Sequence, residues 1–183
     1  MTAPAPGGLG GGWADLAAQV AACTACPELV AARTRVVVGH CPPGARLLLV
    51  GEAPGAEEDR TGQPFVGRSG QLLDRLLAQA GLDRAAVAVL NVLKCRPPGN
   101  RSPRRAEVAR CRGWLDRQVD LVDPGAVVTL GGTAATWALG RGATIGALRA
   151  GQHAVRGRPL LVTYHPSAAL RGGPDGPVAR ALA

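Results

Sequence analysis

Short apolar runs, interrupted by glycine, proline or polar residues, alternate along the chain with segments whose apolar residues follow helical spacing. The run Leu-Leu-Leu-Val at residues 47–50 is apolar on both faces of an extended chain, which is typical of a central strand in a parallel sheet. Between residues 69 and 80, leucine and alanine form one helical stripe, and Gly81 follows as a helix-ending residue. The pattern predicts strands at residues 45–50, 87–93, 126–130 and 160–164, and helices at residues 13–25, 69–80, 102–121 and 133–139.

Strands that alternate with helices predict an α/β fold, here a three-layer α-β-α sandwich around a central, mainly parallel sheet of four strands. Residues 34–39 are a further β-rich stretch, and Ser102 followed by Pro103 is the expected start of the third helix. The length of 183 residues fits one domain. We expect a disordered leader at residues 1–12, the domain at residues 13–175 and a flexible tail at residues 176–183.

The charge balance favours a polyanionic partner, because 21 Lys and Arg residues face 13 Asp and Glu residues, for a formal net charge of +8. Lys94 is the only lysine, so a compositional bias toward arginine is also present, but such a bias does not create an excess of base over acid. No apolar run approaches the roughly 20 residues that a membrane span needs, and the first residues lack the order of a signal peptide. We therefore expect a cytoplasmic protein that binds nucleic acid and no membrane.

Five cysteines are dispersed through the chain, and in a reducing cytosol they do not indicate a disulfide framework. Four of them suggest a metal or cluster site: Cys23, Cys26, Cys95 and Cys111. The alternative is one zinc ion held by four thiolates, although zinc ribbons usually present two close pairs. Cys41 is left over and is given no role.

Polar residues stand at the ends of predicted strands, where parallel sheets place their ligand sites. Asn91 ends a strand built of valine and leucine, and it needs a polar partner, which is either a ligand or the backbone of a neighbouring loop. His165 ends another strand. Phe65, the only phenylalanine, lies in a loop rich in glycine and proline, where it either stacks on a ligand or anchors the loop to the core.

Four motifs together resemble the family 4 uracil-DNA glycosylases, the iron-sulfur type. They are Gly-Glu-Ala-Pro-Gly at residues 51–55, Gly-Gln-Pro-Phe-Val-Gly-Arg-Ser-Gly-Gln-Leu-Leu at residues 62–73, Asn-Val-Leu-Lys-Cys-Arg-Pro-Pro-Gly-Asn-Arg at residues 91–101, and His-Pro-Ser at residues 165–167. The resemblance covers roughly residues 23–171. It implies the uracil-DNA glycosylase fold, uracil-containing DNA as partner, and a monomer that starts base excision repair by hydrolysing the N-glycosidic bond of a flipped uracil.

The resemblance also implies the roles of individual residues. Asn91 reads uracil, Phe65 stacks on it, and His165 stabilises the departing base. Glu52 is our choice to position water, although other members of the superfamily use an aspartate in this loop, where the residue after Glu52 here is Ala53. Glu58 is expected beside uracil C5. The other expected substrate-binding residues are Gly51, Ala53 and Ser167. The four cysteines Cys23, Cys26, Cys95 and Cys111 are expected to hold a [4Fe-4S] cluster.

Two alternatives remain open at this stage. A related covalent uracil-DNA-binding protein carries a nucleophilic histidine in an inserted loop, but no histidine lies between residues 96 and 121 here. An iron-sulfur protein that only binds nucleic acid or carries electrons would not need Asn91, Phe65 and His165 together.

Overall fold

The computed structural model describes residues 12–140, 144–173, 176 and 178, and its central element is a sheet with the strand order β2-β1-β3-β5-β4. The strands are β1 (Leu47–Gly51), β2 (Ala88–Asn91), β3 (Ala126–Leu130), β4 (His153–Val155) and β5 (Arg158–Thr163). Strand β1 pairs in parallel with β2 and β3, and β3 pairs in parallel with β5. The predicted α/β fold with a mainly parallel sheet is confirmed.

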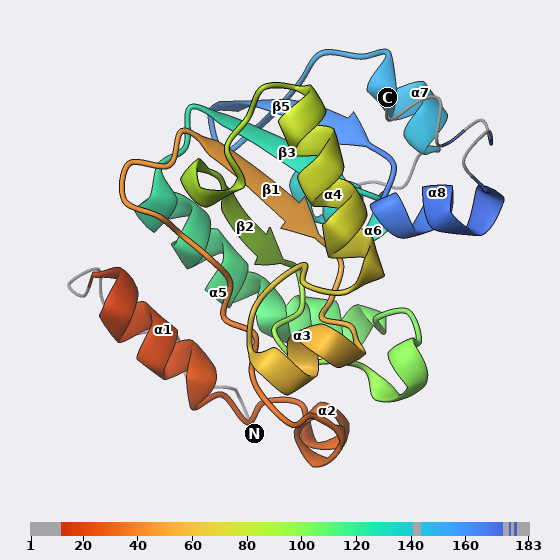
Figure 1. Cartoon of the computed structure of the whole chain (residues 1–183). Coiled ribbons are helices and arrows are strands. Elements are labelled where there is room, and N and C mark those ends of the chain that lie inside the picture. Colours follow the sequence, from red (N-terminus) through yellow and green to blue (C-terminus); the bar gives the residue numbers. More distant parts are fainter. Residues whose placement is uncertain (1–11, 141–143, 174–175, 177, 179–183) are drawn as a thin grey trace.

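The helices occupy both faces of this sheet (Figure 1). They are α1 (Trp13–Ala21), α2 (Pro27–Ala32), α3 (Ala56–Thr61), α4 (Arg68–Gln79), α5 (Arg105–Val122), α6 (Gly132–Leu139), α7 (Ile145–Arg149) and α8 (Pro166–Gly172), with short 3₁₀ helices at Arg84–Ala86 and Pro98–Asn100. Among the described residues, none of these helices is long and apolar enough to cross a membrane. The expected leader and tail lie almost wholly outside the described residues and stay predictions.

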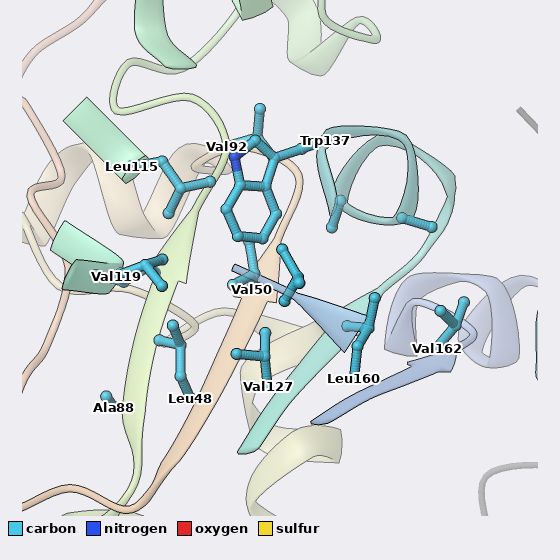
Figure 2. Packing of buried hydrophobic residues seen from close by; sticks show 14 of the residues in the cluster. Leu48, Val50, Ala88, Val92, Leu115, Val119, Val127, Trp137, Leu160 and Val162 are labelled. Carbon is cyan, nitrogen blue, oxygen red and sulfur yellow. The ribbon is translucent and has the colours of Figure 1, made fainter. Parts of the chain in front are cut away.

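Side chains alternate along β1 between two apolar layers, as its uninterrupted hydrophobic run requires. Leu48 and Val50 face the layer that contains Leu115 of α5 and Trp137 of α6, and Figure 2 shows these side chains packed together. Leu49 faces the other layer, which contains Leu73 and Leu77 of α4. The buried position of β1 fixes the loop that follows it at the carboxyl edge of the sheet.

The prediction of four strands is wrong, because β4 adds a fifth strand that pairs antiparallel with β5 at one edge. Strand β4 has only three residues, so its alternation of buried and exposed side chains is too short to be recognised in the sequence. The two-residue turn between β4 and β5 holds Arg156 at φ 50° and Gly157 at φ 79°, a left-handed pair typical of a tight hairpin.

Other boundaries differ from the prediction. Residues 34–39 form no strand, and pairing in this part of the chain is limited to an isolated antiparallel bridge between His40 and Val89. Helix α1 ends at Ala21, four residues early, and α5 begins at Arg105 rather than at the Ser-Pro pair. Its start is fixed instead by Glu107, whose Oε2 accepts a hydrogen bond from the backbone N–H of Arg104 at 2.7 Å.

Candidate active site and cysteine site

A pocket of about 700 Å³ opens at the carboxyl ends of the parallel strands, where the sequence predicts the site. All but one of the residues predicted to catalyse or to bind substrate line it: Glu52, Ala53, Glu58, Phe65, Asn91, His165 and Ser167. The exception is Gly51, which lies at the end of β1. The fold therefore brings the motif at residues 51–55 next to the motif at residues 165–167.

Asn91 presents an unsatisfied polar atom at this pocket. Its side chain is only 2% exposed, and Oδ1 has no hydrogen-bond partner among the described residues. A Cβ at Gly51 would lie 2.5 Å from this Oδ1 and 2.5 Å from Cζ of Phe65. Glycine is therefore needed at residue 51, and its hydrogen allows the amide and the aromatic ring to approach each other. A buried, unpartnered carbonyl oxygen is costly and calls for a donor from a ligand.

Phe65 is only 6% exposed and packs with Leu49 and Leu73, which fits the alternative that it anchors its loop to the core. Its ring nevertheless lines the pocket, so Phe65 both anchors its loop and offers an aromatic surface. The backbone of Phe65 has φ 55°, an uncommon conformation for a residue other than glycine. Gly70 of α4 makes this possible, since a Cβ there would lie 1.8 Å from the Phe65 carbonyl oxygen.

Glu58 holds this loop in place through its buried carboxylate. Oε1 accepts hydrogen bonds from the backbone N–H groups of Val66 at 2.9 Å and Gly67 at 2.8 Å. Oε2 accepts a hydrogen bond from the backbone N–H of Gly55 at 3.0 Å. One side chain thus joins the turn after β1 to the segment that carries Phe65. Its neighbour Glu57 is exposed and pairs with Arg60, as expected for a solvated charge.

His165 is held as a neutral imidazole with a defined tautomer. Burial is the main cause that lowers the pKa of His165, to about 4. The charge of Arg171 also lowers this pKa, and the charge of Glu58 partly opposes the shift. Nδ1 accepts a hydrogen bond from the backbone N–H of Ser167 at 3.2 Å, and Ser167 Oγ lies 2.9 Å from the same nitrogen. Because an N–H can only donate, Nδ1 carries no proton, and Nε2 is the donor. The ring lies 5.7 Å from the Phe65 ring, centroid to centroid.

Glu52 is oriented by a residue that sequence reasoning missed. The hydroxyl of Thr133, in the first turn of α6, donates a hydrogen bond to Oε2 of Glu52. The residues between them number about 80, and nothing in the local sequence of Thr133 indicates this contact. Hydrogen bonding to one carboxylate oxygen leaves Oε1 of Glu52 available to another partner.

The four predicted cysteine ligands also come together. Cys23, Cys26, Cys95 and Cys111 line one small cavity, together with Leu93 and Lys94. Among the described residues, no three His, Cys, Asp or Glu side chains form a site for a single metal ion. The shared cavity suits either group considered from the sequence, a zinc ion held by four thiolates or a [4Fe-4S] cluster.

Hydrogen-bond donors surround these sulfurs. Arg33 Nη1 lies 2.9 Å from Cys95 Sγ, and Trp114 Nε1 lies 3.4 Å from Cys23 Sγ. Arg110 hydrogen-bonds to Cys26. Burial raises the pKa of Cys111 to about 11, so an isolated thiolate is unfavourable there. The donors suit thiolate sulfurs, the form in which cysteine binds a metal.

Burial also perturbs Lys94, which stands between the two sites. Desolvation lowers the pKa of Lys94 to about 8, partly offset by Cys111 and Cys95. The ammonium form still predominates at neutral pH.

Two arginines near the pocket are engaged with carboxylates. Arg101 donates to both oxygens of Glu107, at 2.9 and 2.6 Å, and also to Glu28 of α2 at 3.2 Å. Arg104 pairs with Glu28 as well. The hydrogen bond from Arg101 is the main reason why the pKa values of Glu28 and Glu107 are lowered. These contacts tie α2 to the segment that lines the pocket.

Comparison with known proteins assigns this arrangement to a family. The model of the uracil DNA glycosylase superfamily matches residues 38–180, which include every pocket residue described above. The chain therefore belongs to the uracil DNA glycosylase superfamily, and the resemblance predicted from its motifs is confirmed.

Similar relatives within the superfamily are of two types. The chain is 44% identical over 155 residues to the type-4 uracil-DNA glycosylase of Thermotoga maritima, an alignment that covers 84% of this chain and 80% of the relative. It is 38% identical over 164 residues to the type-4 uracil-DNA glycosylase of Sulfurisphaera tokodaii, covering 83% and 73%. It is 36% identical over 200 residues to the type-5 uracil-DNA glycosylase of Mycobacterium tuberculosis, covering 87% and 74%.

Proposed function

We propose that the protein is a uracil-DNA glycosylase that binds a flipped uracil in the strand-end pocket and hydrolyses its N-glycosidic bond. The observation that carries this proposal is the buried, unpartnered Oδ1 of Asn91 at a pocket that also holds neutral His165. The superfamily membership and the names of the relatives support it. The pocket volume of about 700 Å³ suits a nucleotide turned out of the DNA stack.

Base recognition falls to Asn91. Its Oδ1 accepts the N3–H of uracil, and its Nδ2 donates to uracil O4. Cytosine presents the opposite pattern on this edge, with an acceptor at N3 and a donor at N4, so buried polar groups would stay unpaired. Phe65 supplies the surface on which the base stacks.

Departure of the base is assisted by His165. As the bond between C1′ and N1 breaks, its electron pair moves onto the base, and negative charge develops at N1 and O2 of uracil. The Nε2–H of His165 donates a hydrogen bond to O2 and stabilises this charge. The Ser167 N–H, which holds Nδ1 unprotonated, keeps the ring in the tautomer that this step needs.

The sugar carbon is attacked by water that Glu52 positions. The hydrogen bond from Thr133 to Oε2 of Glu52 leaves Oε1 to take the water proton as the water oxygen bonds to C1′. The products are free uracil and an abasic site in an uncut strand, the starting point of base excision repair.

The cysteine set Cys23, Cys26, Cys95 and Cys111 holds a [4Fe-4S] cluster in this proposal. The shared cavity and the donors directed at sulfur support the assignment. When bound, the cluster supplies a structural cross-link between the start of the chain and the segment that leads into α5. No catalytic step requires it.

The proposal is tested with purified protein, a uracil-containing oligonucleotide, and the matching thymine oligonucleotide as control. We expect strand breakage at uracil only after alkali treatment, with no change in the thymine strand. A stable band of retarded mobility on a denaturing gel would instead identify covalent capture, and an intact strand after alkali would reject the glycosylase.

A further inference from the structure

Lys94 is the only lysine of the chain, yet its side chain is only 2% exposed. Burying an ammonium group is costly unless a counter-charge and hydrogen-bond acceptors compensate it. In residues 12–140 and 144–173, no carboxylate forms an ion pair with Lys94. The ammonium group of Lys94 must therefore be stabilised by other groups inside the protein.

The polar surroundings of Lys94 belong to two different sites. Its Nζ donates a hydrogen bond to the backbone carbonyl oxygen of Asn91 at 2.7 Å. The lysine also lines the cavity of the four cysteines, and its charge interacts with Cys111 and Cys95. The side chain therefore touches the residue proposed to read the base and lies beside two of the proposed cluster ligands.

We propose that Lys94 is a positioning residue whose ammonium group fixes the Asn91 turn and draws its counter-charge from the thiolates of Cys95 and Cys111. This inference rests on the proposed cluster. It gives the cluster ligands a second role besides the cross-link. Their negative charge would stabilise the ammonium group of Lys94 next to Asn91.

The backbone at this turn is held from two directions. On one side, the N–H groups of Val92 and Leu93 donate to the carbonyl oxygens of Gly51 and Glu52, both at 3.0 Å. On the other side, Lys94 Nζ binds the Asn91 carbonyl. Both sets of hydrogen bonds hold the backbone that follows Asn91. Loss of the ammonium group removes one of them, so the side-chain amide of Asn91 can rotate away from the pocket.

Two neutral variants separate the charge of Lys94 from its hydrogen bond. Lys94→Met removes both, whereas Lys94→Gln removes the charge and keeps a donor. Arg112→Met is the matched control, because Arg112 is an exposed cation next to Cys111 that pairs with Asp116. For each protein the measurements are iron per chain, the reduction potential of the cluster, and kcat/KM on a uracil oligonucleotide.

We expect the reduction potential to shift to more negative values in both Lys94 variants, because a nearby cation stabilises the more negative reduced state. The control should keep the potential of the parent. In Lys94→Met, kcat/KM should fall by about tenfold, the effect of leaving one buried acceptor unpaired. In Lys94→Gln the loss should be smaller, and this variant tests the charge on its own if Lys94→Met does not fold.

The outcomes distinguish this inference from the proposed function. If the parent protein contains no iron, both the proposed cluster and the role of Lys94 fall. If the parent contains iron but both neutral variants keep its potential, the role of Lys94 alone is overturned. A shifted potential with unchanged kcat/KM in Lys94→Met would likewise overturn the link to Asn91.

Discussion

The base pocket and the cysteine site meet at residues 91–95, but they differ in how their geometry is held. In the pocket, the chain itself completes most of the polar contacts: Glu58 binds three backbone N–H groups, and His165 is fixed by Ser167. The pocket also stands on the ends of paired strands. Its shape is therefore a property of the fold.

The cysteine site has no such support. Its four thiols come from the turn after α1, the segment after β2 and the middle of α5, and no strand pairing joins these segments. Donors surround the sulfurs, but burial raises the pKa values of Cys26, Cys95 and Cys111. The difference predicts that the pocket is preformed, whereas the stability of the cysteine site depends on the proposed cluster.

The largest effect should come from breaking the cysteine site. We expect Cys111→Ser to lose iron and to unfold at a markedly lower urea concentration, because one ligand of a group that cross-links three segments is removed. Cys41→Ser, the matched control outside the site, should keep both properties. Iron analysis and urea titration followed by circular dichroism measure the two effects. Equal iron content in the two variants would contradict the ligand assignment.

In the pocket, His165→Ala should keep its fold and slow uracil excision by about 100- to 1000-fold, the usual cost of removing one donor to a developing anion. Binding of uracil DNA should change little. The defect should shrink with 5-fluorouracil, a base that departs more easily, and should shrink less for Glu52→Ala. If His165→Ala slows the excision of uracil and of 5-fluorouracil by the same factor, His165 does not act on the leaving group.

Asn91→Ala should lower the excision rate by about 10- to 100-fold, because the base loses its paired partner in a buried site. Affinity for DNA, which phosphate contacts dominate, should stay close to that of the parent protein. Single-turnover rates and filter binding measure the two quantities. An excision rate equal to that of the parent would reject the assignment of Asn91 to base recognition.

The sequence was sufficient to predict the site residues that lie at the ends of strands. Asn91 and His165 are polar residues that follow apolar strands, and parallel strands deliver their carboxyl ends to one edge of the sheet. The side-chain chemistry of these positions could therefore be predicted without coordinates. The same holds for the four cysteines, whose number and motif context brought them into one group.

The contacts that orient these residues could not be predicted. The hydrogen bond from Thr133 to Glu52 depends on how α6 packs against β1, and the left-handed backbone of Phe65 depends on its close approach to Gly70. Both are consequences of tertiary packing rather than of local pattern. The short strand β4 was missed for a related reason, since three residues carry no reliable periodicity.

The pH dependence of stability offers a finer test of the preformed pocket. The pKa of His165 is lowered to about 4 in the folded protein, against about 6.5 when unfolded, so protonation favours the unfolded state. The contribution of neutral His165 to the free energy of unfolding is complete above pH 6.5 and is lost as the pH falls toward 4. Between pH 7 and 4.5, the urea midpoint of the parent should therefore fall more than that of His165→Gln.

The smallest expected effect concerns the arginines that lie between the two sites. Four arginines, Arg96, Arg101, Arg104 and Arg105, lie in the segment that leads into α5, and arginine side chains suit contacts with phosphates. In the structure Glu28 of α2 pairs with Arg101 and Arg104, whereas exposed Arg105 forms no hydrogen bond or ion pair with the described residues. Glu28 thus balances the charges of Arg101 and Arg104, and it leaves the charge of Arg105 unbalanced.

Arg104 and Arg105 are neighbours with the same side chain, so they provide a matched pair. Arg105→Ala should reduce the slope of log affinity against log salt by about 1, the value for one lost phosphate contact. Arg104→Ala should change the slope less, because its charge is already balanced by Glu28. Glu28→Gln should increase the slope by releasing Arg104. If Arg104→Ala and Arg105→Ala reduce the slope equally, the ion pair between Arg104 and Glu28 does not persist on DNA, and Glu28 does not influence DNA binding through it.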